Sequence, residues 1–195
     1  MKKNIAVLAG DGIGPEVMIQ AIRVLKEIEK KYQHHFNFTE AKIGGAAFDE
    51  YQNHCPQETI DVCKQSDAIL FGSVGGPVDA QLEPKWKNCE ANSLLAIRKH
   101  FGFNINIRPV RMYSELSDHS PLKQSVIGDN TDIVIFRELI GDIYFGEHKQ
   151  GTDKNGIRYA KDTADYNEEQ IKSILHAAFQ AAKNRDKKVT SVDKA

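Results

Sequence analysis

The sequence lacks the features that mark disulfide frameworks, zinc sites and membrane spans. It has only three cysteines, Cys55, Cys63 and Cys89, with no Cys-x-x-Cys pair among them. This odd number without ligand spacing predicts reduced thiols in a cytoplasmic protein. The first apolar run, residues 5–9, stops at Gly10. A run of that length is too short for a signal-peptide core or for a helix that crosses a bilayer.

The sequence also lacks an excess of charge of either sign. Its 26 basic and 27 acidic residues leave a net charge of −1. Such a balance gives no electrostatic reason to expect nucleic acid or an anionic membrane as a partner. The seven histidines are scattered without the spacing of metal ligands. We therefore expect an ordinary globular protein whose own residues form no metal site.

The first hundred residues alternate between strand and helix patterns. Buried strands are expected at 4–9 and 68–72, and the alternating stretch 36–43 predicts another strand. Helices are expected from Pro15 to about Lys31, where Val17, Ala21, Leu25 and Ile28 recur at helical spacing, and at 56–65. The order β-α-β-α-β is typical of a mostly parallel sheet covered by helices, so the fold class is α/β.

The remaining residues predict a helix and several more strands. A helix is expected at 94–100, and a second one begins after the capping residue Asn167. The dipeptide Asn155-Gly156 indicates a hairpin, whose polar strands suggest an arm that reaches away from the body. Strands are expected at 107–113, 132–136, 143–147, 157–163 and 187–192.

The glycine cluster after the first strand resembles a dinucleotide-binding loop but departs from it. Gly10 and Gly12 fit the G-x-G-x-x-G pattern, whereas the third glycine, Gly14, comes one position early and is followed by Pro15. No Lys-Ser/Thr pair follows, so the loop is not a P-loop. The pattern alone leaves two interpretations open: an anion or cofactor site at a helix N-terminus, or a structural turn.

Six motifs in order resolve this choice by resemblance. GDGIGPEV is followed by FGSVGGP (71–77), LLAIRKHF (94–101), NIRPVRMY (106–113), RELIGDIYFGE (137–147) and VTSVDKA (189–195). This series resembles the β-decarboxylating hydroxyacid dehydrogenases, and among them the 3-isopropylmalate dehydrogenases. The resemblance implies a two-domain α/β fold without the Rossmann fingerprint. Residues 1–103 would begin the cofactor-side domain, and residues 104–195 the domain that carries the dimer arm.

The resemblance also implies the reaction and the residues that bind the substrate. The reaction is the NAD-dependent oxidation of 3-isopropylmalate, followed by decarboxylation to 4-methyl-2-oxopentanoate, in leucine biosynthesis. Arg98, Arg108 and Arg137 would bind its carboxylates, because the planar guanidinium pairs with a carboxylate through two hydrogen bonds. Leu94 and Leu95 would hold its alkyl group. A third carboxylate, as in isocitrate, would be left unpaired beside these leucines.

Further residues are assigned to proton transfer and to the cofactor by the same resemblance. Tyr144 would be the acid, and Lys194 the base, acting in the active site of a partner subunit in a homodimer. Ile13, Gly75, Gly76 and Glu90 would contact NAD. The aspartates that bind Mg²⁺ or Mn²⁺ in such enzymes would lie beyond Ala195.

Several alternatives stay open at this point. Related activities are tartrate/malate or homoisocitrate dehydrogenase, against which the leucine pair argues. The chain ends about halfway through the family pattern, so it is expected to be a non-catalytic fragment, or a subunit that needs a complementing C-terminal half. Two residues depart from the pattern: Ile140 replaces a threonine and Asp142 a glycine. If that glycine has a positive φ, aspartate tolerates the conformation better than most residues do.

Overall fold

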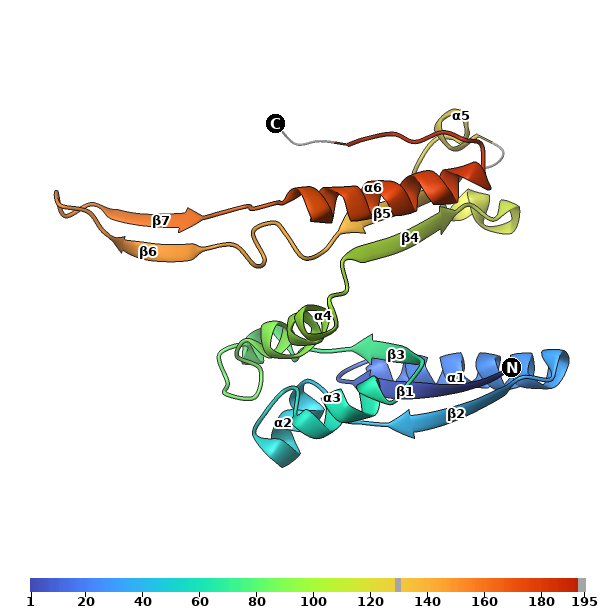
Figure 1. The fold of residues 1–195 in the computed structure, drawn as a ribbon, viewed down its shortest axis with the longest axis horizontal. Helices are drawn as coiled ribbons and strands as arrows, with labels where there is room; N and C mark the ends of the chain where they lie inside the picture. The colour runs from blue at the N-terminus through green and yellow to red at the C-terminus, as the bar shows by residue number, and fades with distance from the viewer. Residues whose placement is uncertain (129–130, 193–195) are drawn as a thin grey trace. The chain divides into compact units, whose positions relative to one another are not determined.

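The computed structural model describes residues 1–128 and 131–192. The chain divides into two compact units, Met1–Phe101 and Gly102–Ala195 (Figure 1). No helix in the described residues is both long enough and apolar enough to cross a membrane.

The first unit is a three-stranded parallel sheet with helices on both faces. Its strands are β1 (Lys2–Gly10), β2 (His35–Glu40) and β3 (Ala68–Ser73), in the order β2-β1-β3. Its helices are α1 (Gly14–Tyr32), α2 (Gly45–Tyr51), α3 (Gln57–Lys64) and α4 (Ala96–Phe101), with a short 3-10 helix at Val78–Ala80 and a π-helical turn at Ala91–Leu95. The predicted parallel sheet and its β-α-β-α-β order are confirmed. Helix α2 is additional to the prediction.

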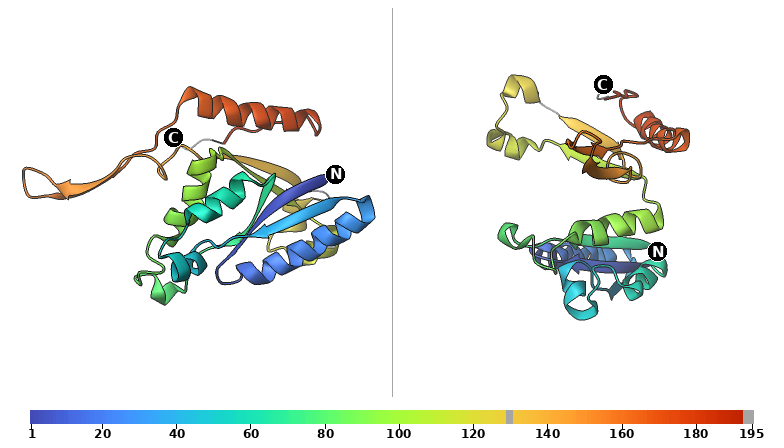
Figure 2. Two further views of the ribbon diagram at one scale, coloured as in Figure 1. Left: turned by 60° about the horizontal axis from the view of Figure 1, so that its bottom comes forward. Right: turned by 90° about the vertical axis from the view of Figure 1, so that its left-hand side faces the viewer.

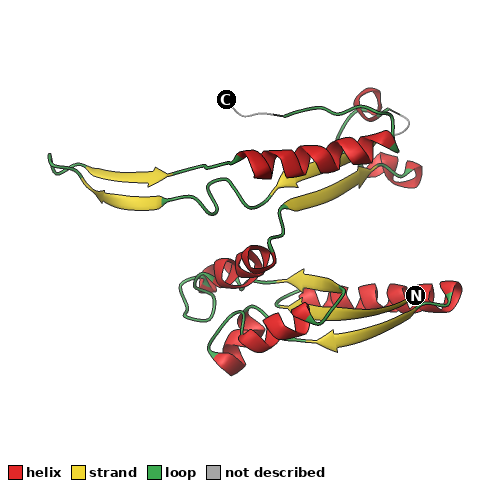
Figure 3. Cartoon of the chain, viewed as in Figure 1, coloured by secondary structure: helices red, strands yellow, loops and turns green. Residues whose placement is uncertain are grey.

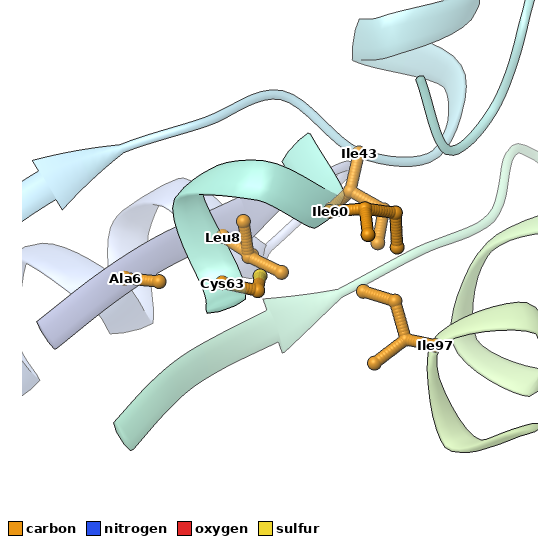
Figure 4. Close-up of a cluster of buried hydrophobic side chains, with 6 residues drawn as sticks. All are labelled: Ala6, Leu8, Ile43, Ile60, Cys63 and Ile97. Carbon is orange, nitrogen blue, oxygen red and sulfur yellow. The ribbon is translucent and has the colours of Figure 1, made fainter. Parts of the chain in front are cut away.

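The core of the first unit lies on both sides of β1, because alternate residues of a strand point to opposite faces. Ile5 and Val7 pack with Met18 of α1. On the other face, Ala6 and Leu8 pack with Ile60 and Cys63 of α3, together with Ile43 and Ile97 (Figure 4). Helices α1 and α3 therefore cover opposite faces of the sheet (Figure 2).

The expected stripe on α1 is confirmed in part: Ala21, Leu25 and Ile28 are half-buried as predicted, but Val17 is not. The helix covers the predicted range, but its packed residues are Met18, Ile22 and Leu25, whereas Val17 is 49% exposed. The side chains that meet Ile5 and Val7 follow the i, i+4, i+7 spacing that begins at Met18.

The second unit is built on a two-stranded antiparallel sheet, β4 (Ile105–Arg111) and β5 (Asp132–Glu138). Helix α6 (Glu168–Lys183) packs on β5. Two hydrogen bonds connect the helix region to the sheet. Asn104 Nδ2, just before β4, donates to Ser173 Oγ in the first half of α6 (2.6 Å). Arg185 Nη2, just after α6, donates to Asp132 Oδ1 at the start of β5 (2.8 Å). A 3-10 helix (Ser114–His119) and α5 (Gln124–Ile127) connect the two strands.

The hairpin predicted around Asn155-Gly156 and its second strand are confirmed, but its first strand is residues 148–152 and not the predicted residues 143–147. It consists of β6 (His148–Thr152) and β7 (Arg158–Asp162) (Figure 3). Almost all of its residues are exposed. Gly156 has φ +81°, and the Asp153 carboxylate accepts from the amides of Asn155 and Ile157. Among the described elements, the main contacts of this ribbon are those between its own two strands.

Two predicted strands are wrong. Residues 143–147 form a turn, because the amides of Phe145 and Gly146 donate to the Asp142 carbonyl (3.3 and 3.2 Å) instead of to a neighbouring strand. Residues 187–192 carry a strand-like sequence but are not in a strand. A strand is defined by pairing, and this segment pairs with neither β4 nor β5.

Helix α6 begins as its sequence predicts. Asn167 Oδ1 accepts from the Gln170 amide (3.0 Å), and the Gln170 side chain accepts from the Asn167 amide (2.9 Å). This reciprocal pair is a capping box. Of the predicted apolar face, Ile174, Ala178 and Ala182 are at least half-buried, whereas Ile171 and Leu175 are more exposed.

Candidate functional site

Two glycine loops meet where β1 and β3 end. Helix α1 connects β1 to β2. In the sheet, β2 lies on one side of β1 and β3 lies on the other side. The strand order therefore reverses between β1 and β3, the place where open parallel sheets bind their ligands. The Asp11 amide donates to the Ser73 carbonyl (2.7 Å), and the Ser73 hydroxyl donates to the Asp11 carbonyl (2.8 Å). The loops after the two strands are thus directly joined.

The carboxylate of Asp11 lies inside this junction, and the sequence motifs gave it no role. Its oxygens accept from the amides of Gly45 (2.8 Å), Ala46 (2.8 Å) and Gly75 (3.1 Å). The Cys89 thiol lies 3.9 Å from Oδ2, and burial together with the nearby Asp11 carboxylate raises the pKa of that thiol. Asp11 thus connects segments that are 34 to 78 residues away along the chain.

The residues expected to contact the cofactor lie around this junction or close to it in the chain. Gly75 has φ +124°, and a Cβ added there would meet no described atom within 4 Å. Ile13 is 57% exposed at the start of α1, and Glu90 is exposed before the π-helical turn. Gly76 differs, because the ring of Trp86 fills the space beside it. Gly75 and Ile13 therefore leave space for a ligand, whereas Gly76 does not.

The residues expected to bind the substrate in the first unit lie in one helical segment, which runs from the π-helical turn Ala91–Leu95 into α4. Ser93 and Ile97 are buried, while Leu94, Leu95 and Arg98 are half-buried beside them. The helix begins earlier than predicted, with the π-helical turn Ala91–Leu95. Such turns are rare and are frequent at functional sites.

The second unit places two of the predicted arginines together. Arg108 faces Ile135 and Arg137 faces Asn106 across the β4–β5 pair, so both arginines project from one face. As diagonal neighbours, their Cα atoms lie about 7–8 Å apart. Asn106 Oδ1 accepts from Arg108 Nε (2.6 Å), which leaves the outer nitrogens of that guanidinium free of this contact. Within the described residues, neither arginine forms an ion pair with a carboxylate.

Tyr144 joins these arginines in the turn after β5. The Arg137 guanidinium carbon lies 5.5 Å from the centroid of the Tyr144 ring, within the range of a cation–π contact. The tyrosine is 53% exposed. Because two cationic groups and a phenol share an open face, this part of the second unit suits a ligand with carboxylate groups.

Asp142 sets the turn that carries Tyr144. Its φ is +70°, so the conformation that the glycine of the family pattern suggested is present here. Asp142 Oδ1 accepts from the Ile143 amide (2.7 Å), and Glu138 accepts from the amides of Ile140 and Gly141 (both 2.8 Å). Burial, followed by the charges of Asp142 and Glu138, raises the pKa of the neighbouring Tyr166.

One predicted site residue, Lys194, lies outside the described residues. No group of three His, Cys, Asp or Glu side chains in the described part of the chain is placed to hold a metal ion. The residues on hand therefore do not fit the Mg²⁺ or Mn²⁺ that the resemblance implies.

Comparison with known proteins gives the same relationship over the whole chain. The sequence profile described as "Isocitrate/isopropylmalate dehydrogenase" matches residues 4–195. The 3-isopropylmalate dehydrogenase of Clostridium pasteurianum is 47% identical over 198 residues, covering 98% of this chain and 53% of that protein. That of Helicobacter hepaticus is 46% identical over 200 residues, covering 100% of this chain and 54% of that protein. The chain spans about half the length of these relatives.

The fold is shared with solved structures. A β-decarboxylating dehydrogenase from Thermococcus kodakarensis superposes with a TM-score of 0.63 at 29% identity, covering 94% of this chain and 46% of that one. An isocitrate dehydrogenase from Methylococcus capsulatus, at 18% identity, gives a TM-score of 0.71, which shows the fold alone. By its sequence and its α/β fold, the chain belongs to the isocitrate/isopropylmalate dehydrogenase family.

Proposed function

We propose that this chain supplies the substrate-binding and nicotinamide-side residues of an NAD-dependent dehydrogenase that oxidises and decarboxylates 3-isopropylmalate. The observation that carries the proposal is the pair Arg108 and Arg137 on one face of β4–β5, with Tyr144 beside Arg137. Two neighbouring cations that have no carboxylate partner in the described part of the chain repel one another. A dicarboxylate relieves that repulsion and accepts paired hydrogen bonds from each guanidinium.

The choice of 3-isopropylmalate rests on Leu94 and Leu95. These side chains are half-buried beside Arg98 and present no polar group to a ligand. An isopropyl group buries its apolar surface there, whereas the third carboxylate of isocitrate or homoisocitrate would lose its water without gaining a partner. The smaller substrates malate and tartrate would leave the leucines without contact.

The protein's own groups would handle two protons. Oxidation at the substrate's C2 removes the hydroxyl proton, for which we propose Lys194, acting in the active site of a partner subunit. When CO₂ leaves, C3 gains a proton, for which we propose Tyr144. The arginines orient the carboxylates throughout, because a planar guanidinium pairs with a carboxylate through two parallel hydrogen bonds.

Ile13, Gly75, Gly76 and Glu90 are proposed to hold the nicotinamide half of NAD, which accepts the hydride when it is bound. The accessible backbone at Gly75 supports this assignment. A homodimer is proposed because the role of Lys194 in a partner subunit's active site requires two chains. The exposed β6–β7 ribbon supports it, since an isolated two-stranded hairpin is marginally stable in water without further packing.

Titration of the 195-residue chain with 3-isopropylmalate in a calorimeter tests the proposal. Arg108→Lys and Arg137→Lys keep the charge but lose the paired geometry, so each is expected to weaken binding about tenfold or more. Arg111→Lys is the matched control, because Arg111 lies on the same strand but projects from the opposite face. Equal binding by all three variants would contradict the assignment of the arginine face.

The same titration decides the substrate. Leu94→Ala is expected to weaken binding of 3-isopropylmalate about tenfold and to leave malate binding almost unchanged. Tighter binding of isocitrate or malate than of 3-isopropylmalate by the unsubstituted chain would favour one of the related activities instead.

A further inference from the structure

The amides around Asp11 have the arrangement of an anion site. Gly45 and Ala46 begin a short helix after Gly44, whose φ is +71°, and Gly75 belongs to the loop after β3. All three amides donate to one carboxylate. Backbone amides that converge in this way, in glycine-rich loops, bind phosphate in nucleotide sites.

The anion in this site is part of the protein. Asp11 is only 7% exposed, and its oxygens take all three amides. The space is also closed, because a Cβ added to Gly44 would come within 2.3 Å of Asp11 Oδ2. A cofactor phosphate therefore has neither room nor donors at this point, even though the sequence around it resembles a phosphate-binding loop.

We infer that Asp11 is a positioning residue whose carboxylate replaces a phosphate between the two glycine loops and fixes the Gly75–Gly76 backbone for the cofactor. The effect on cofactor binding rests on the proposed function. The loop geometry itself does not, so the two can be tested separately. In this arrangement the cofactor's diphosphate is bound by groups other than the amides of Gly45, Ala46 and Gly75.

The only tryptophan of the chain reports on this geometry. The ring of Trp86 packs against the start of α2 and against the loop after β3: a Cβ added to Gly45 or to Gly76 would come within 2.2 Å of it. Any shift of one of these segments relative to the other changes the surroundings of the ring. Its fluorescence also overlaps the absorption of NADH, so energy transfer measures cofactor binding.

The experiment compares the unsubstituted 195-residue chain with Asp11→Ala, Asp11→Asn and the control Asp79→Ala. Asp79 is exposed in the 3-10 helix that follows the Gly75–Gly76 loop. We would measure the amide resonances of Gly45, Ala46 and Gly75, the emission of Trp86 and the affinity for NADH. Each variant is measured with and without formate, a carboxylate small enough to fill the space that alanine leaves.

In Asp11→Ala we expect the three amide resonances to move, Trp86 emission to shift and NADH affinity to fall at least tenfold. Formate should reverse all three, whereas chloride at the same concentration should not. Asp11→Asn keeps one acceptor oxygen, so it should change less and remain folded if the alanine variant does not. Asp79→Ala should behave as the unsubstituted chain.

The outcomes separate the inference from the proposed function. Unmoved Gly75 and Trp86 signals in both Asp11 variants, or changes that formate does not reverse in a folded Asp11→Ala, would overturn the positioning role. If the signals move and formate restores them but the unsubstituted chain does not bind NADH, the positioning role stands and the cofactor assignment fails. If NADH binds equally to all variants while the loop signals move, the loop geometry is set by Asp11 but does not serve the cofactor, which also overturns the inference.

Discussion

The two units are stabilised in different ways. The first buries both faces of a parallel sheet, with Ala6, Leu8 and Ile43 at 0% exposure. The second covers one face of a two-stranded sheet with α6 and leaves Val110, Ile133 and Ile135 about half exposed on the other. The first unit thus buries many more apolar side chains than the second does. Rigid packing holds the glycine loops, while the arginines lie on an open face.

The largest expected difference between the units concerns core truncation. Leu8→Ala removes a fully buried side chain and is expected to lower the free energy of unfolding by about 2–5 kcal/mol. Ile135→Ala, at a 47% exposed position, should cost less than about 1 kcal/mol. Urea unfolding followed by Trp86 fluorescence reports the first unit specifically. A shift of that transition by Ile135→Ala as large as that by Leu8→Ala would show that the two units unfold together.

Helix caps sharpen the comparison. Asn167→Ala removes the capping box of α6 and is expected to cost about 1 kcal/mol. Ile13, at the same position of α1, makes no side-chain capping bond, so Ile13→Ala should change stability by less than about 0.5 kcal/mol. Hydrogen exchange of the amides in each helix measures both effects. If Asn167→Ala and Ile13→Ala reduce amide protection equally, packing and not the capping box stabilises the start of α6.

These contrasts explain which parts of the fold the sequence predicts. Strand β1 and helices α1 and α6 are predicted because their signals are local: an apolar run, a helical period and a capping residue. Helix α2 is missed because its sequence opens with Gly44-Gly45, and its first amides are bound by Asp11, 34 residues earlier. Residues 143–147 have strand-forming side chains, but the conformation of Asp142 turns the chain there.

The residues of the candidate site also differ in whether a local sequence signal predicts them. The pairing of Arg108 and Arg137 follows from two strands that the sequence indicates, once their register is known. Asp11 has no local signal for its role, because its partners are loops distant in the chain. Such a residue is found only when the distances between those loops are known.

The turn at Asp142 provides a smaller test within the second unit. In the glycine loops of the first unit, Gly10, Gly12 and Gly44 take the positive φ, whereas here an aspartate does. Asp142→Ala loses the bond to the Ile143 amide and keeps the backbone strain, so it should be less stable than Asp142→Gly by about 1 kcal/mol. In both variants the pKa of Tyr166 should fall towards its usual value, which ultraviolet titration detects. Equal stability of the two variants would argue against strain at this position.

The smallest expected effect is the acid dependence of one ion pair in each unit. The hydrogen bonds from Lys3 and the Asn4 amide lower the pKa of Asp67 in the first unit, and the Arg185 guanidinium lowers that of Asp132 in the second. A carboxyl group with a lowered pKa in the folded state stabilises the fold above its unfolded pKa, near 4. That contribution is lost as the pH falls through the lower, folded value.

Asp67→Asn should therefore flatten the acid limb of the unfolding transition detected by Trp86 fluorescence. Asp132→Asn should likewise flatten the acid dependence of amide protection in α6. Because both pairs are exposed, 0.5 M NaCl should shrink both effects. If the acid limb keeps its slope in Asp67→Asn, the acid sensitivity of the first unit does not come from the pair of Lys3 and Asp67.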